Sequence, residues 1–328
     1  TRGTSSTKGW WNSKAMKRFR RNPLGIIGSL ILILFLLVAI FAASLTSSQL
    51  INYRNNCVRD LGLGRETVAN VRNPLKPVFW RAVVAPPASC FNIPRANFSE
   101  VPSPPSQLAV LGTASGGYDI YYGLVWGART AFYAALAVTG FSLIVGIIIG
   151  SIAGFFGGWV DNVIMRIIDV ILAMVISTIL GQELVNVVIS LSILGWAGYA
   201  RFLRGEILRV RGLEFVDGAR ALGARSGRLI FKHVLPNSIG SLLILASLDI
   251  GTVVLGVAAL SFLGLGAPAG YADWGQMINF ARGWITGLPG QPFAYWYVIF
   301  WPGFIIVLFV LGWNLLGDAV RDALDVRS

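Results

Sequence analysis

The stretch EFVDGARALGARSGRLIFKHVLPN, residues 214–237, is a charged helical segment between long apolar runs. On a helix, one face holds mainly apolar or small side chains: Phe215, Ala219, Leu222 and Ser226. Three charged residues stand three positions apart on an adjacent face: Glu214, Asp217 and Arg220. Gly223 is a natural helix stop, so the sequence predicts a short helix that ends there.

A second short amphipathic helix is expected from Ser226 to Val234. Its apolar residues are interleaved with basic ones: Leu229, Ile230 and Phe231 beside Arg225, Arg228 and Lys232. Pro236 suits the first turn of the next helix, because its missing N–H would be unpaired there in any case. The sequence thus predicts two separate short helices before the following apolar run.

The rest of the chain has the composition of a membrane protein. Of its 328 residues 55% are hydrophobic and 13% are charged, and the mean hydropathy is +0.67. Soluble domains carry about 25% charged residues. The net charge of +12 sits in clusters between apolar runs rather than along one helix face. The basic residues therefore indicate topology signals and headgroup contacts, and nucleic acid is not expected as a partner.

The apolar runs predict an all-α integral membrane protein. A bilayer core about 30 Å thick needs about 20 apolar residues in a helix, because backbone groups cannot stay unpaired in hydrocarbon. Six runs are candidates: about 24–45, 131–155, 160–180, 184–201, 239–262 and 296–316. The chain is expected to leave the bilayer near Arg201 and to re-enter it near Asn237.

Lys and Arg near the spans give the orientation. An inside N-terminus places four segments in the cytoplasm: 1–23, 156–160, 202–238 and 317–328. The first and third are rich in Lys and Arg, so both termini are expected in the cytoplasm. The basic residues before the first apolar run have the charge order of a secretory signal, but the run is too long for one. We expect a retained span, with cleavage near Ala42-Ala43-Ser44 as the alternative.

Residues 46–130 form the expected extracytoplasmic segment. It is rich in Pro and carries both cysteines of the chain, Cys57 and Cys90, which predicts a small irregular lobe. A disulfide between them would close a loop worth about 3–4 kcal/mol in the chain-entropy model, and two free thiols are the alternative. The aromatic stretch GYDIYYGLVWGART, residues 117–130, predicts an amphipathic helix lying in the outer interface.

The sequence predicts no catalytic site, metal site or cofactor on this chain. Two cysteines in one segment are too few for a Cys-rich zinc or iron–sulfur centre. The single His233 stands among basic residues, where a metal-binding or catalytic role is not expected. None of the lysines follows a glycine, so the GxxxxGK[ST] phosphate loop that binds ATP is missing from the sequence.

Asp249 falls near the middle of the fifth predicted span, where an ionised side chain costs about 3 kcal/mol on insertion scales. Two interpretations stay open: a role in a translocation path, or an internal partner such as Arg166 or a helix backbone. Arg166 and Asp169, near the cytoplasmic end of the third span, are expected to pair or to reach the interface. Small residues recur in the second span and predict close helix contacts: Gly140, Gly146, Gly150, Ala153 and Gly154.

The segment 202–238 has two interpretations. Isolated helices shorter than about 12 residues are marginal in water, so these helices need a surface on which to dock. One possible surface is lipid, on which an amphipathic helix can rest. The other is a partner protein, which the mixed charges and the turn at Gly223 favour.

The same segment resembles a known family. The run Asp217-Gly218-Ala219, followed by Gly223 and a closing Leu235-Pro236, looks like the EAA loop in the membrane-spanning subunits of bacterial ATP-binding-cassette (ABC) importers. Asp stands for the usual Glu, and Gly218 for the first Ala. The resemblance implies that ten residues dock on an ATPase: Glu214, Asp217, Gly218, Ala219, Arg220, Ala221, Leu222, Gly223, Leu235 and Pro236.

Further motifs resemble the dipeptide/oligopeptide permease "C" subunits over about residues 15–45 and 110–328. They are Leu111-Gly112-Thr113, Gly127-Ala128-Arg129, Gly157-Gly158-Trp159-Val160-Asp161, Met165-Arg166 with Asp169, Gly195-Trp196-Ala197-Gly198-Tyr199-Ala200-Arg201, Leu260-Ser261-Phe262-Leu263-Gly264-Leu265-Gly266, Trp274-Gly275, and Asn314-Leu315-Leu316-Gly317-Asp318 with Arg321-Asp322. This combination is specific to that family.

The chain departs from the family pattern in three places. Ala114 and Tyr118 stand where an acid and an Arg are usual. The segment between Asp169 and Gly181 is several residues shorter than is typical, which either truncates the third span or means that residues are missing from it. The outer segment 46–110 is longer than usual, and its cysteines are peculiar to this chain.

The resemblance implies a non-enzymatic permease subunit with the ABC type I importer fold, in a bacterial inner membrane. The expected partners are a homologous permease, two ATPases that bind ATP and Mg²⁺, and an extracytoplasmic substrate-binding protein. The implied layout is a basic N-terminus (1–23), a first span (24–45), the outer segment (46–130) and a permease core (131–328) with the coupling loop 202–238. ATP-driven closure would move the spans through that loop as rigid bodies.

The implied cargo is a dipeptide or oligopeptide. Relatives in the same family handle nickel chelates, glutathione or oligosaccharides, and these stay as alternatives. A secondary transporter would be expected to show inverted repeats or a coupling-ion site among broken helices, and neither is found in the sequence. A membrane-anchored receptor or assembly factor would explain the outer lobe but would leave the loop 202–238 without a role.

Overall fold

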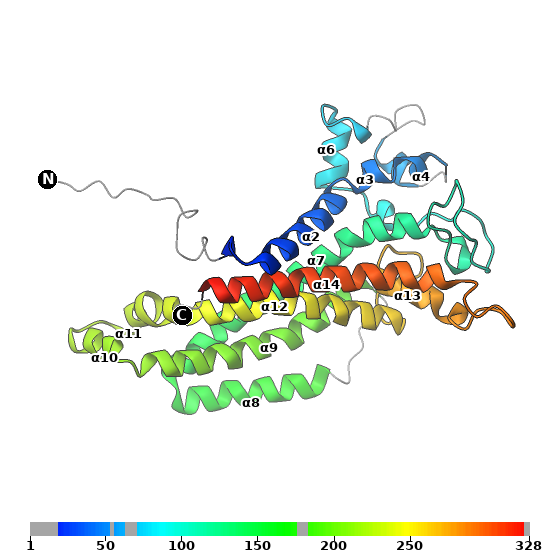
Figure 1. Ribbon diagram of the computed structural model, residues 1–328. Coiled ribbons are helices and arrows are strands. Elements are labelled where there is room, and N and C mark those ends of the chain that lie inside the picture. The colour runs from blue at the N-terminus through cyan, green and yellow to red at the C-terminus, as the bar shows by residue number, and fades with distance from the viewer. Residues whose placement is uncertain (1–18, 53–55, 63–70, 176–182, 325–328) are drawn as a thin grey trace.

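The computed structural model describes residues 19–52, 56–62, 71–175 and 183–324. Within these ranges the secondary structure is helical, with isolated β-bridges and no strands. Five helices there are long and apolar enough to cross a membrane: Pro23–Ile40, Ile120–Phe156, Leu184–Arg211, Ser226–Phe262 and Trp296–Ala323. Figure 1 shows these helices running side by side in one bundle.

The long helices are α2 (Pro23–Ile40), α7 (Ile120–Phe156), α9 (Leu184–Arg211), α12 (Leu235–Phe262) and α14 (Trp296–Leu324). A shorter helix, α8 (Gly158–Val175), lies beside α9. It covers most of the predicted third span, and the remainder of that span lies outside the described residues. Many large apolar side chains of α2 are exposed, as expected for a helix that faces lipid.

The bundle has two distinct ends. At one lie the short helices α10 (Glu214–Ala221) and α11 (Ser226–Arg228), and at the other lies α13 (Trp274–Ala281). We call these the α10 end and the α13 end. The start of α2 and the last turns of α14 both lie at the α10 end, where the Asn22 side-chain amide donates to Asp322 Oδ2 at 2.9 Å. Asn22 also caps α2 through its side-chain oxygen, and Pro23 follows at the first helical position.

Helix α7 begins well before the second predicted span. It starts at Ile120, after Asp119 as N-cap, and contains all of residues 131–155. The predicted interfacial helix 117–130 is largely the first turns of α7, and the side chains of Tyr122 and Trp126 there are fully buried. The outer lobe covers these rings, with the Tyr122 hydroxyl donating to the Cys90 carbonyl and Trp126 Nε1 donating to Thr46. The aromatic stretch is therefore core.

Helix α9 covers the fourth predicted span and continues beyond Arg201 to Arg211. The loop after it differs from the prediction. The predicted second short helix, 226–234, is α11 followed by the π-helix η5 (Leu229–Val234). Since η5 runs directly into α12, the segment from Ser226 to Phe262 is one continuous helical rod. Pro236 lies in the first turn of α12, but the chain does not break there.

The α13 end carries the outer lobe. Its short helices are α3 (Ala42–Leu45), α4 (Ser47–Asn52), α5 (Asn56–Asp60), α6 (Pro77–Val84) and η3 (Ala88–Phe91). Cys57 and Cys90, both fully buried, form a disulfide that joins α5 to η3. Beside it the Ser89 hydroxyl donates to Asp60 Oδ2 at 2.6 Å, and this hydrogen bond lowers the pKa of Asp60. The short helices η4 (Ser115–Gly117) and η6 (Arg282–Trp284) complete this end.

An aromatic cluster joins α2, α13 and α14. The rings of Phe35, Trp274 and Phe309 pack edge to face, with centroids 5.3 to 5.8 Å apart. Trp274 Nε1 also donates to the Leu124 carbonyl at 3.0 Å. Edge-to-face pairs add to the free energy of burying the rings. This cluster fixes α2 and α13 against α7 and α14.

Helices α7 and α9 approach each other closely through the predicted small residues. A Cβ on Gly146 would lie 2.5 Å from Tyr199 Cβ, and one on Gly150 would lie 2.6 Å from the Ala200 carbonyl oxygen. Gly140 differs, since a Cβ there would have nothing within 4 Å. Only part of the small-residue set therefore makes the helix contact.

Candidate functional site

Residues 214–234 fold into one structure at the α10 end, which we call the α10–η5 hairpin. Helix α10 begins after Leu213, whose carbonyl accepts from the amide of Val216 at 2.9 Å. Its first turn carries Glu214 and Asp217, and its last turn carries Arg220. This order complements the helix dipole, which is positive at the N-terminus and negative at the C-terminus.

Gly223 terminates α10 with a Schellman motif. Its φ of +83° lies in the left-handed region, which an L side chain rarely adopts. The amide of Ala224 donates to the carbonyl of Ala219 at 3.1 Å. The amide of Gly223 donates to the carbonyl of Arg220 at 3.0 Å. The helix stop expected at Gly223 is therefore present, and it turns the chain back toward η5.

One apolar residue of α10 anchors the hairpin. Val216 is fully buried and belongs to a cluster with Leu229 and Val234 of η5 and with Val210 of α9. The sequence reasoning missed Val216 and placed the apolar face on its neighbours. A single buried valine on an eight-residue helix gives no periodic signal, because period detection needs a longer window.

The predicted face of α10 is largely exposed. Leu222 is 90% exposed, Phe231 in η5 is 74% exposed and Phe215 is 45% exposed. Nearby, Arg220 donates to Asp217 Oδ1 at 2.8 Å in a surface ion pair. The hairpin thus presents apolar side chains beside charged ones at the tip of the molecule, an arrangement typical of protein-binding surfaces.

One salt bridge and one further hydrogen bond fix the helices that carry the hairpin. Asp161 of α8, only 6% exposed, accepts two hydrogen bonds from the guanidinium of Arg204 in α9. Arg211, at the end of α9, donates to the carbonyl of Phe155 in α7 at 2.5 Å. These contacts join the ends of α7, α8 and α9 at the base of the hairpin. The sequence reasoning found neither pair, because more than 40 residues separate the partners.

Asp249 lies at a second polar position, midway along the bundle. Its Oδ2 accepts a hydrogen bond from the Tyr199 hydroxyl at 2.8 Å. An internal partner is thus present, but it is Tyr199 and not Arg166, and the side chain of Asp169 lies outside the described residues. Asp249 and Tyr199 line a pocket of about 300 Å³ between α7, α9 and α12. In that pocket the hydroxyl of Thr139, 5% exposed, has no hydrogen bond within the described part of the chain.

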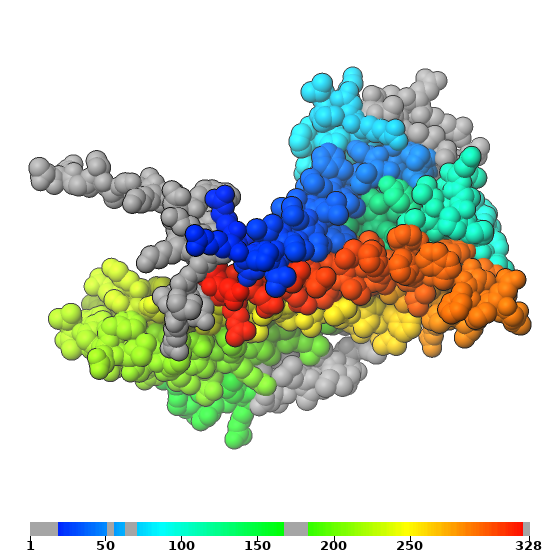
Figure 2. Space-filling view, in the orientation of Figure 1, coloured from blue at the N-terminus to red at the C-terminus, as the bar shows by residue number. Residues whose placement is uncertain are grey.

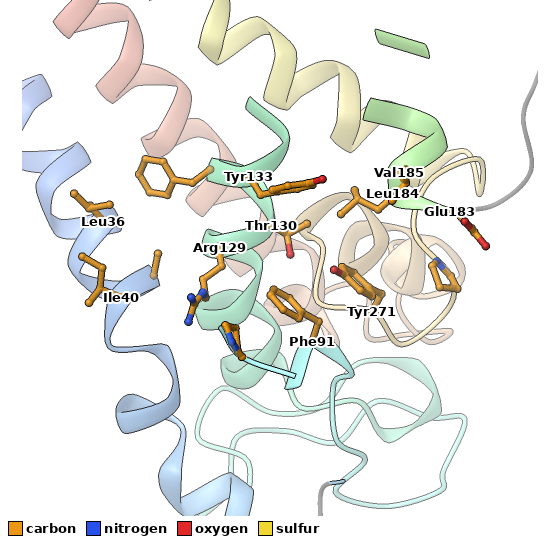
Figure 3. Close-up of a pocket in the computed structure, with 14 residues that line it drawn as sticks. Leu36, Ile40, Phe91, Arg129, Thr130, Tyr133, Glu183, Leu184, Val185 and Tyr271 are labelled. Carbon is orange, nitrogen blue, oxygen red and sulfur yellow. The ribbon is translucent and has the colours of Figure 1, made fainter. Parts of the chain in front are cut away.

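A larger pocket, of about 780 Å³, lies between α2, α7 and the start of α9. Figure 3 shows Leu36 and Ile40 of α2 on one side and Leu184 and Val185 on the other. Among the lining residues, Arg129 donates to the Ala82 and Val83 carbonyls at 3.0 and 2.5 Å and is therefore already engaged. In the part of the chain that the structure describes, no cluster of His, Cys, Asp and Glu could hold a metal ion.

The bundle of long apolar helices with a polar hairpin at one end defines a multi-pass membrane protein. Residues 146–328 match the family described as binding-protein-dependent transport system inner membrane component, and residues 10–56 match the N-terminal transmembrane domain of oligopeptide transport permease C. The chain belongs to this family of ABC transporter permease subunits. The resemblance to dipeptide/oligopeptide permease "C" subunits is thereby confirmed.

Several curated relatives share most of this chain. The dipeptide transport system permease protein DppC of Alkalihalophilus pseudofirmus is 36% identical over 96% of the chain and 89% of the relative. The oligopeptide transport system permease protein OppC of Bacillus subtilis is 33% identical over 95% of the chain and 88% of the relative. The nickel transport system permease protein NikC of Escherichia coli is 45% identical, but only over 45% of the chain and 50% of the relative.

Proposed function

We propose that this chain imports peptides as one of two homologous permeases in an ATP-driven complex. The relatives that match nearly the full chain are named for dipeptide and oligopeptide transport. The nickel permease matches over less than half of it. This difference in coverage supports a peptide as the cargo, and it leaves a nickel chelate, glutathione or an oligosaccharide as alternatives within the family.

We further propose six passes through the membrane with both termini in the cytoplasm. Helix α7 ends at the α10 end, where Phe155 meets Arg211, and α9 begins near the other end, where Leu184 packs with Ala134 of α7. The chain between them must therefore cross back, and α8 follows this course. The basic residues of segments 1–23 and 202–238 favour the cytoplasm for the α10 end.

The α10–η5 hairpin is the proposed docking surface for an ATPase subunit. The proposed docking residues are eight from the hairpin and two from the start of α12: Glu214, Asp217, Gly218, Ala219, Arg220, Ala221, Leu222, Gly223, Leu235 and Pro236. The hairpin's exposed Leu222 and its paired charges support this role. Two long helices attached to the hairpin, α9 before it and α12 after it, would carry a displacement into the bundle because packed helices move as rigid bodies.

ATP and Mg²⁺ would bind to two partner ATPases, since this sequence lacks a phosphate loop. An extracytoplasmic substrate-binding protein would deliver the cargo at the α13 end. Asp249 would line the path between the two permeases. Its placement beside Tyr199 and Thr139 in a pocket between three helices supports that assignment.

Co-purification tests the docking role. A Leu222→Asp variant should lose a co-expressed ATPase, because a charge would enter an apolar contact. A Phe293→Asp variant is the matched control: Phe293 is 79% exposed and lies near Ala281 of α13, and this variant should keep the ATPase. Equal retention by both variants would overturn the docking surface.

Uptake into proteoliposomes that contain the whole complex tests the cargo. Labelled di- and oligopeptides should accumulate with ATP, whereas a nickel chelate and glutathione should not. Uptake driven by an ion gradient without ATP would support the less favoured secondary transporter. Accumulation of a non-peptide solute alone would replace the cargo and leave the importer class intact.

A further inference from the structure

Helix α6 (Pro77–Val84) is placed differently from every long helix. In Figure 1 it runs across the direction of α12 and α14, beside the end of α2. Figure 2 shows it standing out from the side of the molecule, above α2 and α3. If the long helices cross the bilayer, a helix that runs across their direction lies along the membrane plane rather than through it. Its position beside the end of the α2 span places it at the membrane surface.

Two contacts fix which face of α6 points inward. Arg129 of α7 donates to the carbonyls of Ala82 and Val83, in the last turn of α6. The ring of Phe79 packs 5.9 Å from that of Phe41, which follows α2. Phe79 and Ala82 are accordingly 4% and 1% exposed. The orientation of α6 is thus set by the spans themselves.

The opposite face of α6 is apolar and uncovered in this chain. Trp80 and Val84, one helical turn apart, are 57% and 75% exposed, and Leu75 just before the helix is 88% exposed. Exposed apolar residues also stand at the end of α2, where Leu37 is 46% exposed, and just after it, where Phe41 is 40% exposed. The contact between Phe41 and Phe79 brings this exposed end of α2 beside α6.

The charges around this face have one sign. Residues 71–85 contain Arg72, Lys76 and Arg81 and no Asp or Glu, and Lys76 and Arg81 are exposed. Basic side chains beside Trp and aliphatic residues are typical of helices in the headgroup region, where cations meet lipid phosphates. Each cation near an anionic membrane surface adds to binding.

We propose that α6 is an interfacial anchor: Leu75, Trp80 and Val84 enter the acyl boundary of the leaflet at the α13 end, while Lys76 and Arg81 bind phosphates of anionic phospholipids. The anchor would hold the disulfide-bonded lobe at the membrane surface. This inference depends on α2 crossing the bilayer and is independent of the cargo and of ATPase docking.

Site-directed spin labelling of the full-length chain, in its complex and in phosphatidylethanolamine–phosphatidylglycerol liposomes, tests the proposal. Because the two cysteines of the sequence are bonded to each other, one added cysteine is the single labelling site. The test variants are Leu75→Cys and Val84→Cys. The controls are Leu34→Cys, 61% exposed on α2, and Val110→Cys, 55% exposed in the loop before α7.

At both test positions, collisions of the nitroxide with a water-soluble nickel chelate should be several-fold fewer than at Val110. Collisions with oxygen should approach those at Leu34. Chelate collisions equal to those at Val110 would place the face in water, and few collisions with either reagent would place it against another subunit. Each of these two results would overturn the anchor.

The charge component is tested separately. Removing phosphatidylglycerol from the liposomes should raise chelate collisions at the label of the Val84→Cys chain. In a Val84→Cys chain that also carries Lys76→Gln and Arg81→Gln, lipid composition should no longer change these collisions. If the dependence on phosphatidylglycerol persists in that chain, the two side chains do not bind the anionic lipid.

Discussion

The hydroxyl of Tyr199 in α9 donates a hydrogen bond to the carboxylate of Asp249 in α12 across 2.8 Å. This pair links the two long helices attached to the α10–η5 hairpin. A carboxylate inside an apolar bundle is costly unless it is hydrogen-bonded. The contact therefore both accommodates Asp249 and couples α9 to α12 at the level of a polar pocket.

Replacing Tyr199 by Phe should destabilise the folded chain by about 1–3 kcal/mol, because the carboxylate loses its donor. Asp249→Asn keeps an acceptor for the tyrosine and should cost less. If Asp249 lines the path, both variants should also lower the rate of peptide uptake by the complex. Thermal unfolding and uptake are the measurements. Tyr133→Phe, at a side chain that is 55% exposed, is the control and should leave both unchanged.

Gly223→Ala should destabilise the hairpin by about 1–2 kcal/mol, because its φ of +83° is unfavourable for an L side chain. Retention of the ATPase in co-purification should fall with it. Gly227→Ala is the matched control, since that glycine is helical with nothing within 4 Å of a Cβ. A Gly223→Ala chain as stable as the control would show that the turn is not constrained.

Gly150→Ala should weaken the contact between α7 and α9. The new Cβ would lie 2.6 Å from the Ala200 carbonyl oxygen, a backbone atom that cannot move alone. Overpacking of this kind costs about 1–3 kcal/mol. Gly140→Ala, which meets open space, should be neutral or should stabilise α7 by up to about 1 kcal/mol. Thermal unfolding of the two variants in one detergent should rank them in that order, and the reverse order would contradict the packing.

Replacing Cys57 and Cys90 together by Ser should destabilise the outer lobe by about 3–4 kcal/mol, because the unfolded chain gains loop entropy. Limited proteolysis should then cut residues 46–110 faster, while the spans stay protected by the bilayer. Reductant should sensitise the parent chain in the same way and should leave the double variant unaffected. Identical cleavage of all samples would show that the disulfide does not hold the lobe.

The sequence alone identified the chain as a helical membrane protein, because unpaired backbone groups exclude other structures from hydrocarbon. It also placed the helix stop at Gly223, where the requirement is local to one residue's backbone. The family followed from motifs spread over most of the chain. These inferences need only composition, local conformation or short spacing, and no knowledge of which segments touch.

The tertiary structure decided which side chains are buried and which are paired. The aromatic stretch 117–130 has the composition of an interfacial helix, and only the lobe packed over Tyr122 and Trp126 makes it core. Val216 is an anchor because η5 folds back onto it. Asp249 pairs with Tyr199, and Asp161 with Arg204, across more than 40 residues each. Contacts of this range are set by how the helices pack together, and that arrangement is not encoded in any local pattern of residues.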